Sequence, residues 1–349
     1  MRQIYGTSQS GNLKEAVKGI SNPKLILLLS NQEKFKEHVA ELAELYPGVP
    51  SIGCVGMSYA SKVTEKGVSV VAFSDVTVAA NVIEQASVMP VKYISRLEED
   101  LRKVGASERD TVCIDFCTGN DACVLTTMYS VLGRQKISLM GGTGDAGMVS
   151  LNGTVYQDAA VYALVKSTGK VKVYKENLYQ PLSDYRFVAS KTNREKYVLG
   201  ELNGKAAKQV YQDSLHIAEK DIVNQTFKNP LGKMNGQDVC IISIKEVEGN
   251  SLCCYRQVND SDVLTLLQVQ DYKEIAENTV SRIKADFTHI SGVFSVNCVF
   301  RYLLFSQEHN MDDYLNTMGK LGNHAGFIGF GEHYNHQFVN QTMTCVVFE

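Results

Sequence analysis

The sequence predicts an α/β (α+β) fold whose mixed or antiparallel sheets are built from three repeated βαββ units, arranged as two domains. Short apolar runs rich in β-branched residues alternate with amphipathic helical stretches. The order strand, helix, strand, strand occurs three times, which is typical of one supersecondary unit reused around a common core. The 349 residues also exceed what a single hydrophobic core usually serves.

The first repeat lies between residues 24 and 73. The apolar run 25–29 predicts a buried strand, and apolar residues at helical spacing over 35–46 predict a helix. Ser30 and Glu33 have the spacing of a capping box at the start of that helix. Residues 49–56 predict a strand that ends in glycine, and residues 68–73 predict the closing strand.

The second and third repeats follow the same order. Their predicted strands and helices are 111–117, 124–132, 136–147 and 155–165 in the second, and 293–298, 311–321, 325–331 and 338–348 in the third.

Gly142, Gly144 and Gly147 have the G-x-G-x-x-G spacing of a dinucleotide-binding turn, which requires a helix directly afterwards. The sequence instead continues with Asn152-Gly153, a hairpin-turn pair, and then with a strand pattern. We therefore expect no nucleotide here. The glycines are better explained as points where the backbone bends or closely approaches another group.

Between the second and third repeats the pattern changes to strands, a hairpin at 197–204 and a helix at 206–217. The polar segment 225–230 predicts a boundary, so we place one domain at residues 1–225 and the other at residues 226–349.

Composition limits the function. A net charge of −3 provides no basic field for nucleic acid or an anionic membrane, and the longest apolar run is too short to cross a bilayer. The nine cysteines lie mostly in strand-like runs without a disulfide framework or a C-x-x-C metal pair. We therefore expect a cytoplasmic protein without a metal site.

The sequence lacks the common nucleophile and metalloenzyme motifs, so we expect no enzyme, although catalysis stays open. The segment Glu332-His333-Tyr334-Asn335-His336 has two histidines that could bind a metal or haem iron. We favour the alternative, a polar hairpin loop.

Arg301 lies three residues after Cys298, where a strand is expected to give way to a helix. A cation in the first helical turn opposes the helix dipole unless an anion is nearby. Arg301 could therefore bind a carboxylate or phosphate, or it could pair with a nearby Asp or Glu or be solvated. Asp145 and Asp158 could recognise an amine or only cap turns.

The order of several short motifs resembles the FIST family, which pairs an N-terminal and a C-terminal sensory domain. The resemblance covers nearly the whole chain, and no single motif is diagnostic. The motifs are Ile52-Gly53-Cys54, Met140–Asp145, Asp158–Val161, Leu202–Ala206, Asn229–Gly232, Asn297-Cys298-x-x-Arg301, Gly329–Glu332 and Asn340–Thr342. Two places depart from the family pattern: Gly56-Met57-Ser58 replaces a polar Gly-Glu pair, and Ala206 replaces a usual proline.

The resemblance implies a small-molecule sensor, with amino acids as proposed ligands, that is often associated with bacterial signalling proteins. Some family members are described as haem-dependent nitric oxide sensors that regulate a histidine kinase. The family's recurrent polar positions fall here on Asp145, Cys298, Arg301, Glu332, Asn340 and Thr342.

Our leading hypothesis is a cytoplasmic sensor that binds an amino acid or another small carboxylate between the two domains and signals to a separate partner. Arg301 would bind the anionic group with Asn340 and Thr342, while Glu332 and Asp145 would accept from a cationic group. No cofactor is needed. The alternatives are a haem b sensor of nitric oxide with His333 as axial ligand, and an interaction scaffold without a ligand.

Overall fold

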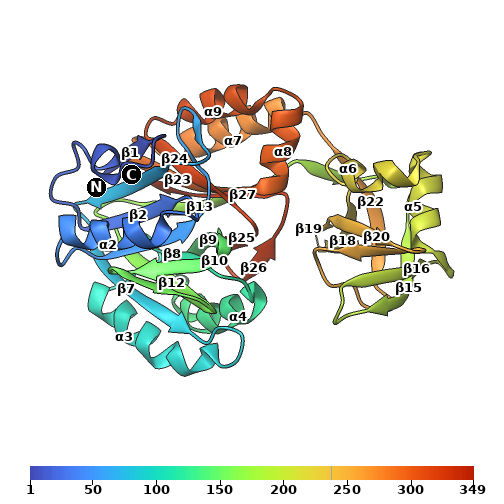
Figure 1. Ribbon diagram of the computed structural model, residues 1–349, viewed down its shortest axis with the longest axis horizontal. Helices are drawn as coiled ribbons and strands as arrows, with labels where there is room; N and C mark the ends of the chain where they lie inside the picture. Colours follow the sequence, from blue (N-terminus) through green and yellow to red (C-terminus); the bar gives the residue numbers. More distant parts are fainter. Residues whose placement is uncertain (237) are drawn as a thin grey trace. The chain divides into compact units, whose positions relative to one another are not determined.

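The computed structural model describes residues 1–236 and 238–349. Spatial contacts divide the chain into two compact units. Unit 1 contains residues 1–176 and 276–349, and unit 2 contains residues 177–275 (Figure 1). The boundary proposed between residues 225 and 226 stays a prediction.

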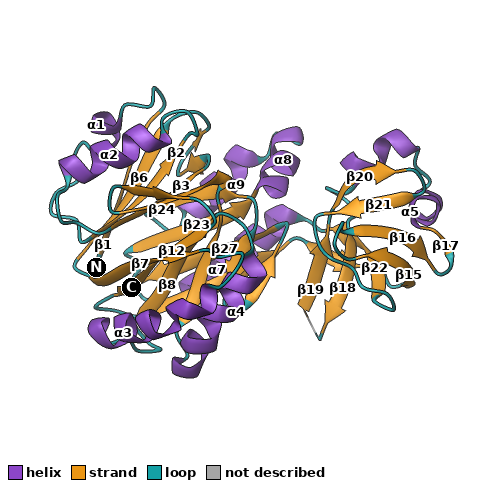
Figure 2. Cartoon of the chain, turned by 60° about the horizontal axis from the view of Figure 1, so that its bottom comes forward, coloured by secondary structure: helices purple, strands orange, loops and turns teal. Residues whose placement is uncertain are grey.

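Unit 1 is built from three six-stranded sheets (Figure 2). Sheet 1 has the order β1 (Arg2–Ser8), β6 (Val68–Ser74), β2 (Leu25–Ser30), β3 (Ser51–Val55), β10 (Asp145–Leu151), β11 (Thr154–Tyr156). Sheet 2 has the order β26 (Gln337–Val339), β25 (Glu332–Tyr334), β9 (Ser138–Thr143), β8 (Thr111–Cys117), β12 (Ala159–Lys166), β7 (Thr77–Glu84). Sheet 3 has the order β13 (Val171–Asn177), β27 (Thr342–Phe348), β23 (Gly292–Cys298), β24 (His324–Gly329), β4 (Ser58–Tyr59), β5 (Val63–Thr64).

The three repeats pair their strands in the same way. In each repeat, the first strand is parallel to the second and antiparallel to the last. The three sets of first, second and last strands are β2, β3 and β6; β8, β9 and β12; and β23, β24 and β27. The connecting helices are α2 (Phe35–Leu45), α4 (Asp121–Leu132), and the pair α8 (Val299–Gln307) and α9 (Met311–Gly319).

A hairpin that follows the second strand of each repeat joins the sheet of another repeat. The hairpin β4–β5 extends sheet 3, β10–β11 extends sheet 1, and β25–β26 extends sheet 2. The three sheets are therefore linked in a closed cycle, in which every repeat completes a sheet that it did not begin.

The repeated glycines lie where these exchanged hairpins meet their host sheets. Gly326 pairs with Ser295 on one side and with Tyr59 of the incoming hairpin on the other, and a Cβ there would come within 2.6 Å of the Tyr59 ring. Gly141 has the same position between Asp115 and His333, and a Cβ there would collide with the Asp115 carboxylate. Glycine thus lets a hairpin side chain reach across the strand to the side chain beyond it.

One hydrophobic core joins the three sheets, because its members include Leu27 of sheet 1, Phe116 of sheet 2 and Phe294 of sheet 3. Helices cover the outer faces (Figure 1). The remaining helices of unit 1 are α1 (Leu13–Ala16), η1 (Pro90–Tyr93), α3 (Ile94–Val104), η2 (Gly133–Gln135), and α7 (Tyr272–Asp286), which belongs to unit 1 from Ala276 on.

Unit 2 is an antiparallel sheet around its own core, curved into a nearly closed barrel. Its strands are β19 (Asp238–Ile242), β18 (Leu231–Asn235), β22 (Val263–Val269), β15 (Phe187–Asn193), β16 (Val198–Leu202), β21 (Ser251–Cys254) and β20 (Ile244–Glu248), with β14 (Tyr179–Pro181) beside β22 and β17 (Lys205–Ala206) beside β16. Its helices are α5 (Ala207–Leu215), η3 (Glu219–Asp221) and α6 (Ile222–Gln225).

The mixed α/β class predicted from the sequence is confirmed. The rejection of a nucleotide-binding turn is also supported, because Gly147 lies within β10 and a turn at Asn152-Gly153 follows this strand, where a helix would be required. The predicted capping box is wrong: α2 begins at Phe35, and the Ser30 hydroxyl bonds His38 Nδ1 instead. In the part of the chain that the structure describes, no helix is both long and apolar enough to span a membrane.

Candidate functional site

The outer face of sheet 3 carries many buried polar side chains. Along β23, Phe294 and Val296 point into the core between the sheets, so Ser295 and Asn297 point to the opposite face. Helices α7, α8 and α9 cover this face (Figure 1). We call the buried polar residues there the helix-side cluster, and they are Tyr59, Glu176, Ser295, Asn297, Arg301, Tyr314 and His324.

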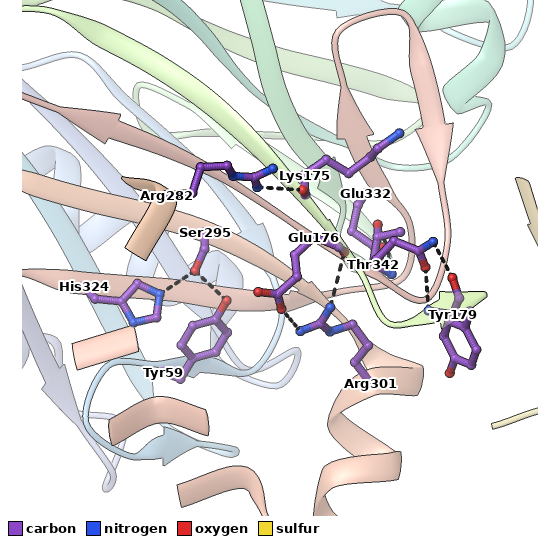
Figure 3. A network of polar contacts seen from close by, with 11 residues as sticks. Tyr59, Lys175, Glu176, Tyr179, Arg282, Ser295, Arg301, His324, Glu332 and Thr342 are labelled. Atoms are coloured by element: carbon purple, nitrogen blue, oxygen red, sulfur yellow. Dashed lines mark hydrogen bonds and ion pairs between the residues drawn. The ribbon is translucent and has the colours of Figure 1, made fainter. Parts of the chain in front are cut away.

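A buried ion pair lies at the centre of this cluster. Arg301 is fully buried in the first turn of α8, as expected from its distance to Cys298. Its Nη2 lies 2.5 Å from Glu176 Oε1, and its Nη1 donates to the Glu176 backbone carbonyl at 3.3 Å (Figure 3). Of the alternatives considered for Arg301, the structure therefore shows the one in which it pairs with an acidic residue. The guanidinium also lies against the rings of Phe305 and Tyr314, at 5.3 and 5.4 Å from their centroids.

Several buried atoms on this face of sheet 3 make no hydrogen bond to the residues that the structure describes. They are Glu176 Oε2, the Tyr314 hydroxyl, and both amide atoms of Asn297. Burial raises the pKa of Tyr314 well above its usual range, and the charges of Glu176 and Arg301 both act on it. A buried polar group without a partner costs about 1–3 kcal/mol. Buried polar groups without a partner are uncommon in folded proteins, and each one calls for an explanation, such as a bound water, an ion or a polar ligand.

A second chain of hydrogen bonds crosses the same face. The Tyr59 hydroxyl bonds Ser295 Oγ at 2.8 Å, and Ser295 Oγ bonds His324 Nε2 at 2.7 Å (Figure 3). Burial lowers the pKa of His324 to about 4, so the imidazole is neutral. Because Ser295 is fully buried, this arrangement does not present a nucleophile to substrate.

Three of the candidate residues, Glu332, Thr342 and Cys298, lie close together. Glu332 Oε2 accepts from Thr342 N at 3.2 Å and from Thr342 Oγ1 at 2.9 Å. The Cys298 thiol also bonds the carboxyl of Glu332. Burial raises the pKa of Glu332 to about 8 despite these bonds and the nearby charge of Arg301. Glu332 is therefore protonated at neutral pH and can donate a hydrogen bond.

His333 is clamped between two carboxylates. Its Nδ1 lies 2.7 Å from Asp115 Oδ2, and its Nε2 lies 2.8 Å from Asp121 Oδ1, which also accepts from Thr143. Burial alone lowers the pKa of His333, but the charges and hydrogen bonds of Asp115 and Asp121 outweigh it and raise the pKa to about 10. The imidazole is therefore a buried cation.

The polar hairpin loop that we favoured for residues 332–336 is wrong in its first half. Glu332 and His333 belong to β25 and are fully buried, because this strand pairs with β9 in sheet 2. Only Asn335 and His336 form the turn between β25 and β26.

Haem iron needs a neutral imidazole nitrogen with a free lone pair. Both nitrogens of His333 are hydrogen-bonded to carboxylates, and the ring is protonated and fully buried. The residues around His333 therefore do not fit haem.

The other two candidate residues lie apart from these contacts. Asn340 is buried, and its Nδ2 makes no hydrogen bond to the described residues. Asp145 is exposed in sheet 1 and accepts from the backbone N–H of Ala146 at 2.7 Å. This contact corresponds to the second role predicted for Asp145, in which its side chain caps a turn.

Sequence reasoning missed Glu176, Tyr314, Asp115 and Asp121. Glu176 lies 125 residues from its partner Arg301, and Asp115 lies 218 residues from its partner His333, so no local sequence pattern could reveal these contacts. Asn297 is different, because it belongs to the Asn297-Cys298-x-x-Arg301 motif and could have been named as a site residue.

The fold and the site define a mixed α/β protein with a buried, only partly satisfied polar cluster. The chain belongs to the FIST family: residues 24–205 match the FIST N domain, and residues 207–335 match the FIST C domain. FIST domains are sensory domains of signal-transduction proteins. Among individually curated proteins, no significant sequence match was found.

Proposed function

We propose that this protein is a cytoplasmic sensor that binds a small zwitterionic molecule, such as an amino acid, in the helix-side cluster and signals to a separate partner such as a histidine kinase. The observation that supports this proposal is the set of buried polar atoms that have no partner among the described residues, on the same face of sheet 3 as the Arg301–Glu176 pair. The nine free cysteines suit a reducing compartment.

The chemistry of these atoms favours a ligand that both donates and accepts. Glu176 Oε2 is an acceptor that suits an ammonium group, whereas Asn297 Nδ2 and the Tyr314 hydroxyl can donate to a carboxylate. The protonated carboxyl of Glu332 adds a further donor near Arg301. A free α-amino acid carries both required groups within a few ångströms.

This proposal changes the role of Arg301. Its guanidinium is already held by Glu176, so it orients that carboxylate and offsets its charge rather than gripping the ligand alone. Arg301 is thus a positioning residue in the proposed site.

Calorimetric titration with the twenty amino acids, simple amines and dicarboxylates tests the proposal. We expect one or a few amino acids to bind, and the Tyr314→Phe variant to lose at least tenfold in affinity while it keeps its fold. The exposed Tyr255→Phe variant in unit 2 is the matched control and should bind normally. If no compound in the panel binds, the scaffold alternative gains support. If Tyr314→Phe binds as the wild type does, the ligand site does not lie at the helix-side cluster.

A further inference from the structure

The loop before α3 exposes three large aliphatic side chains. Val88 is 75% exposed, Met89 is 51% exposed and Val91 is 56% exposed. We call these three residues the apolar knuckle. Aliphatic side chains that gather on the surface rather than occurring singly commonly mark an interaction site.

Specific hydrogen bonds hold the knuckle in this exposed conformation. Asp158 accepts from Ser87 N at 2.9 Å and from Ser87 Oγ at 2.7 Å, and its backbone carbonyl accepts from Ala86 N at 2.9 Å. Met89 N donates to the carbonyl of Gln85 at 3.0 Å. Asp158 thus caps a turn, which was one of its two predicted roles. A partner that binds the knuckle meets a preorganised surface and orders little chain.

The neighbouring face of α4 carries no charge. Its exposed residues are Ala122, Cys123, Thr126 and Ser130. The hydroxyls of Thr126 and Ser130 donate to carbonyls of their own helix, each at 2.7 Å, so they can be covered without losing hydrogen bonds to water. The turn η1, which contains Val91, packs against α4.

The first repeat provides an internal comparison. Helix α2 is the counterpart of α4, and it exposes Lys36, Glu37 and Glu44 to solvent. A charged outer face is usual for a surface helix. The uncharged face of α4 is therefore a property of this helix and not of the repeat.

Two cations lie beside the knuckle on the side of α3, while the carboxylate of Asp158 lies on the other side at Ser87. Lys92 precedes Tyr93 in the sequence and Arg96 follows it. Their cationic groups lie 5.0 and 5.5 Å from the centroid of the Tyr93 ring. A partner would complement them with carboxylates around an apolar pocket.

Helix α4 is also tied to the candidate site. Its first residue, Asp121, is hydrogen-bonded to His333, and the neighbouring residue Glu332 lies within the electrostatic reach of Arg301. A shift of β25 on ligand binding would therefore act directly on the start of α4.

We propose that the apolar knuckle and the uncharged face of α4 form the docking surface for the signalling partner, a protein that presents an apolar pocket rimmed by carboxylates. This inference rests on the proposed function, because a sensor must pass its signal to another protein.

Site-specific photocrosslinking in the native cells tests the surface. A benzophenone amino acid replaces Val88 or Thr126, and replaces Leu45 at the end of α2 as an exposed control. We expect one and the same protein to be crosslinked from Val88 and Thr126, through a segment that contains apolar and acidic residues, and not from Leu45. Crosslinks to a second copy of this chain, to lipid, or with equal yield from Leu45 would overturn the proposal, as would the lack of any crosslink.

The crosslinked protein is then purified and titrated against the full-length chain. The Val88→Asp/Met89→Asp variant should bind it at least tenfold more weakly, whereas Leu45→Asp should bind it normally. Unchanged affinity in the first variant would contradict the proposal. The same proteins are titrated with amino acids, so the proposed ligand binding and the proposed docking surface are tested separately. If the partner binds but no amino acid does, the proposed function is contradicted and the docking surface is still supported.

Discussion

His333 Nδ1 lies 2.7 Å from Asp115 Oδ2, although 218 residues separate them in the chain. The contact crosses Gly141, and it joins a hairpin of the third repeat to the first strand of the second. With Asp121 on the other ring nitrogen, the imidazolium fixes β25 on sheet 2. Glu332, the preceding residue, is thereby held next to Thr342.

Replacing His333 with Asn should lower the free energy of unfolding by about 3–5 kcal/mol, because two buried carboxylates lose their cationic partner. The contribution of His333 is fully present below pH 6.5 and is lost as pH rises towards its folded pKa of about 10. Urea unfolding at pH 6 and pH 9 should therefore show a smaller difference between wild type and variant at pH 9. His336→Asn, at the exposed turn, is the control and should change stability by less than about 0.5 kcal/mol. Equal losses at the two positions would show that the clamp adds no stability.

Glu332→Gln should remove one contribution to the pH dependence of the free energy of unfolding. The pKa of Glu332 is raised from 4.5 to about 8 in the folded protein, so between these values the native state holds a proton that the unfolded state releases. In that window, the titration of Glu332 should lower the free energy of unfolding of the wild type by about 1.4 kcal/mol for each unit by which the pH rises. The variant should lack this contribution. Unfolding measured every half unit from pH 5 to 8 checks it. If the two profiles run parallel, Glu332 does not titrate in this window.

Arg301→Ala should destabilise the protein by about 3–5 kcal/mol, because it leaves Glu176 buried without its cation. The double variant Arg301→Met/Glu176→Met should regain part of this loss, since neither charge is then left alone. The half-exposed pair Lys320–Glu277 is the control, and Lys320→Met should cost far less stability than Arg301→Ala. Losses that simply add in the double variant would mean that the two residues are not coupled.

Gly326→Ala should strongly reduce the yield of folded protein, because the new methyl group meets the Tyr59 ring and the backbone of Ser295. We expect a loss of about 3 kcal/mol or more, in the range of overpacked cores. Gly319 has open space around its Cα, so Gly319→Ala should be neutral or slightly stabilising. Thermal unfolding of both variants measures the difference, and similar melting temperatures would refute the close approach.

The sequence predicted the repeated units because hydrophobic periodicity and the glycine-ended strands are local signals. It also predicted correctly that Arg301 lies in the first turn of a helix, since the strand pattern and the helix pattern meet at Cys298. It did not predict that each hairpin completes the sheet of another repeat, because pairing such as Gly141 with His333 depends on contacts far apart in the chain.

The same limit applies to the site. A run of polar residues at 332–336 predicts a solvated loop, and only the tertiary contacts with Asp115, Asp121 and Thr342 bury its first two residues. The acidic partner of Arg301 was left open for the same reason, because Glu176 lies in a strand whose alternating pattern gives no sign of an ion pair.

The most direct test of the proposed sensor is the effect of Asn297→Leu on stability with and without ligand. Both amide atoms of Asn297 are buried without partners among the described residues, so this change should leave the free energy of unfolding of the ligand-free protein unchanged or raise it by about 1 kcal/mol. Adding the best-binding amino acid at one hundred times its Kd should stabilise the wild type by about 2.7 kcal/mol and the variant by far less. A variant that is strongly destabilised without ligand, yet is stabilised by the amino acid as much as the wild type, would contradict a ligand site at the helix-side cluster.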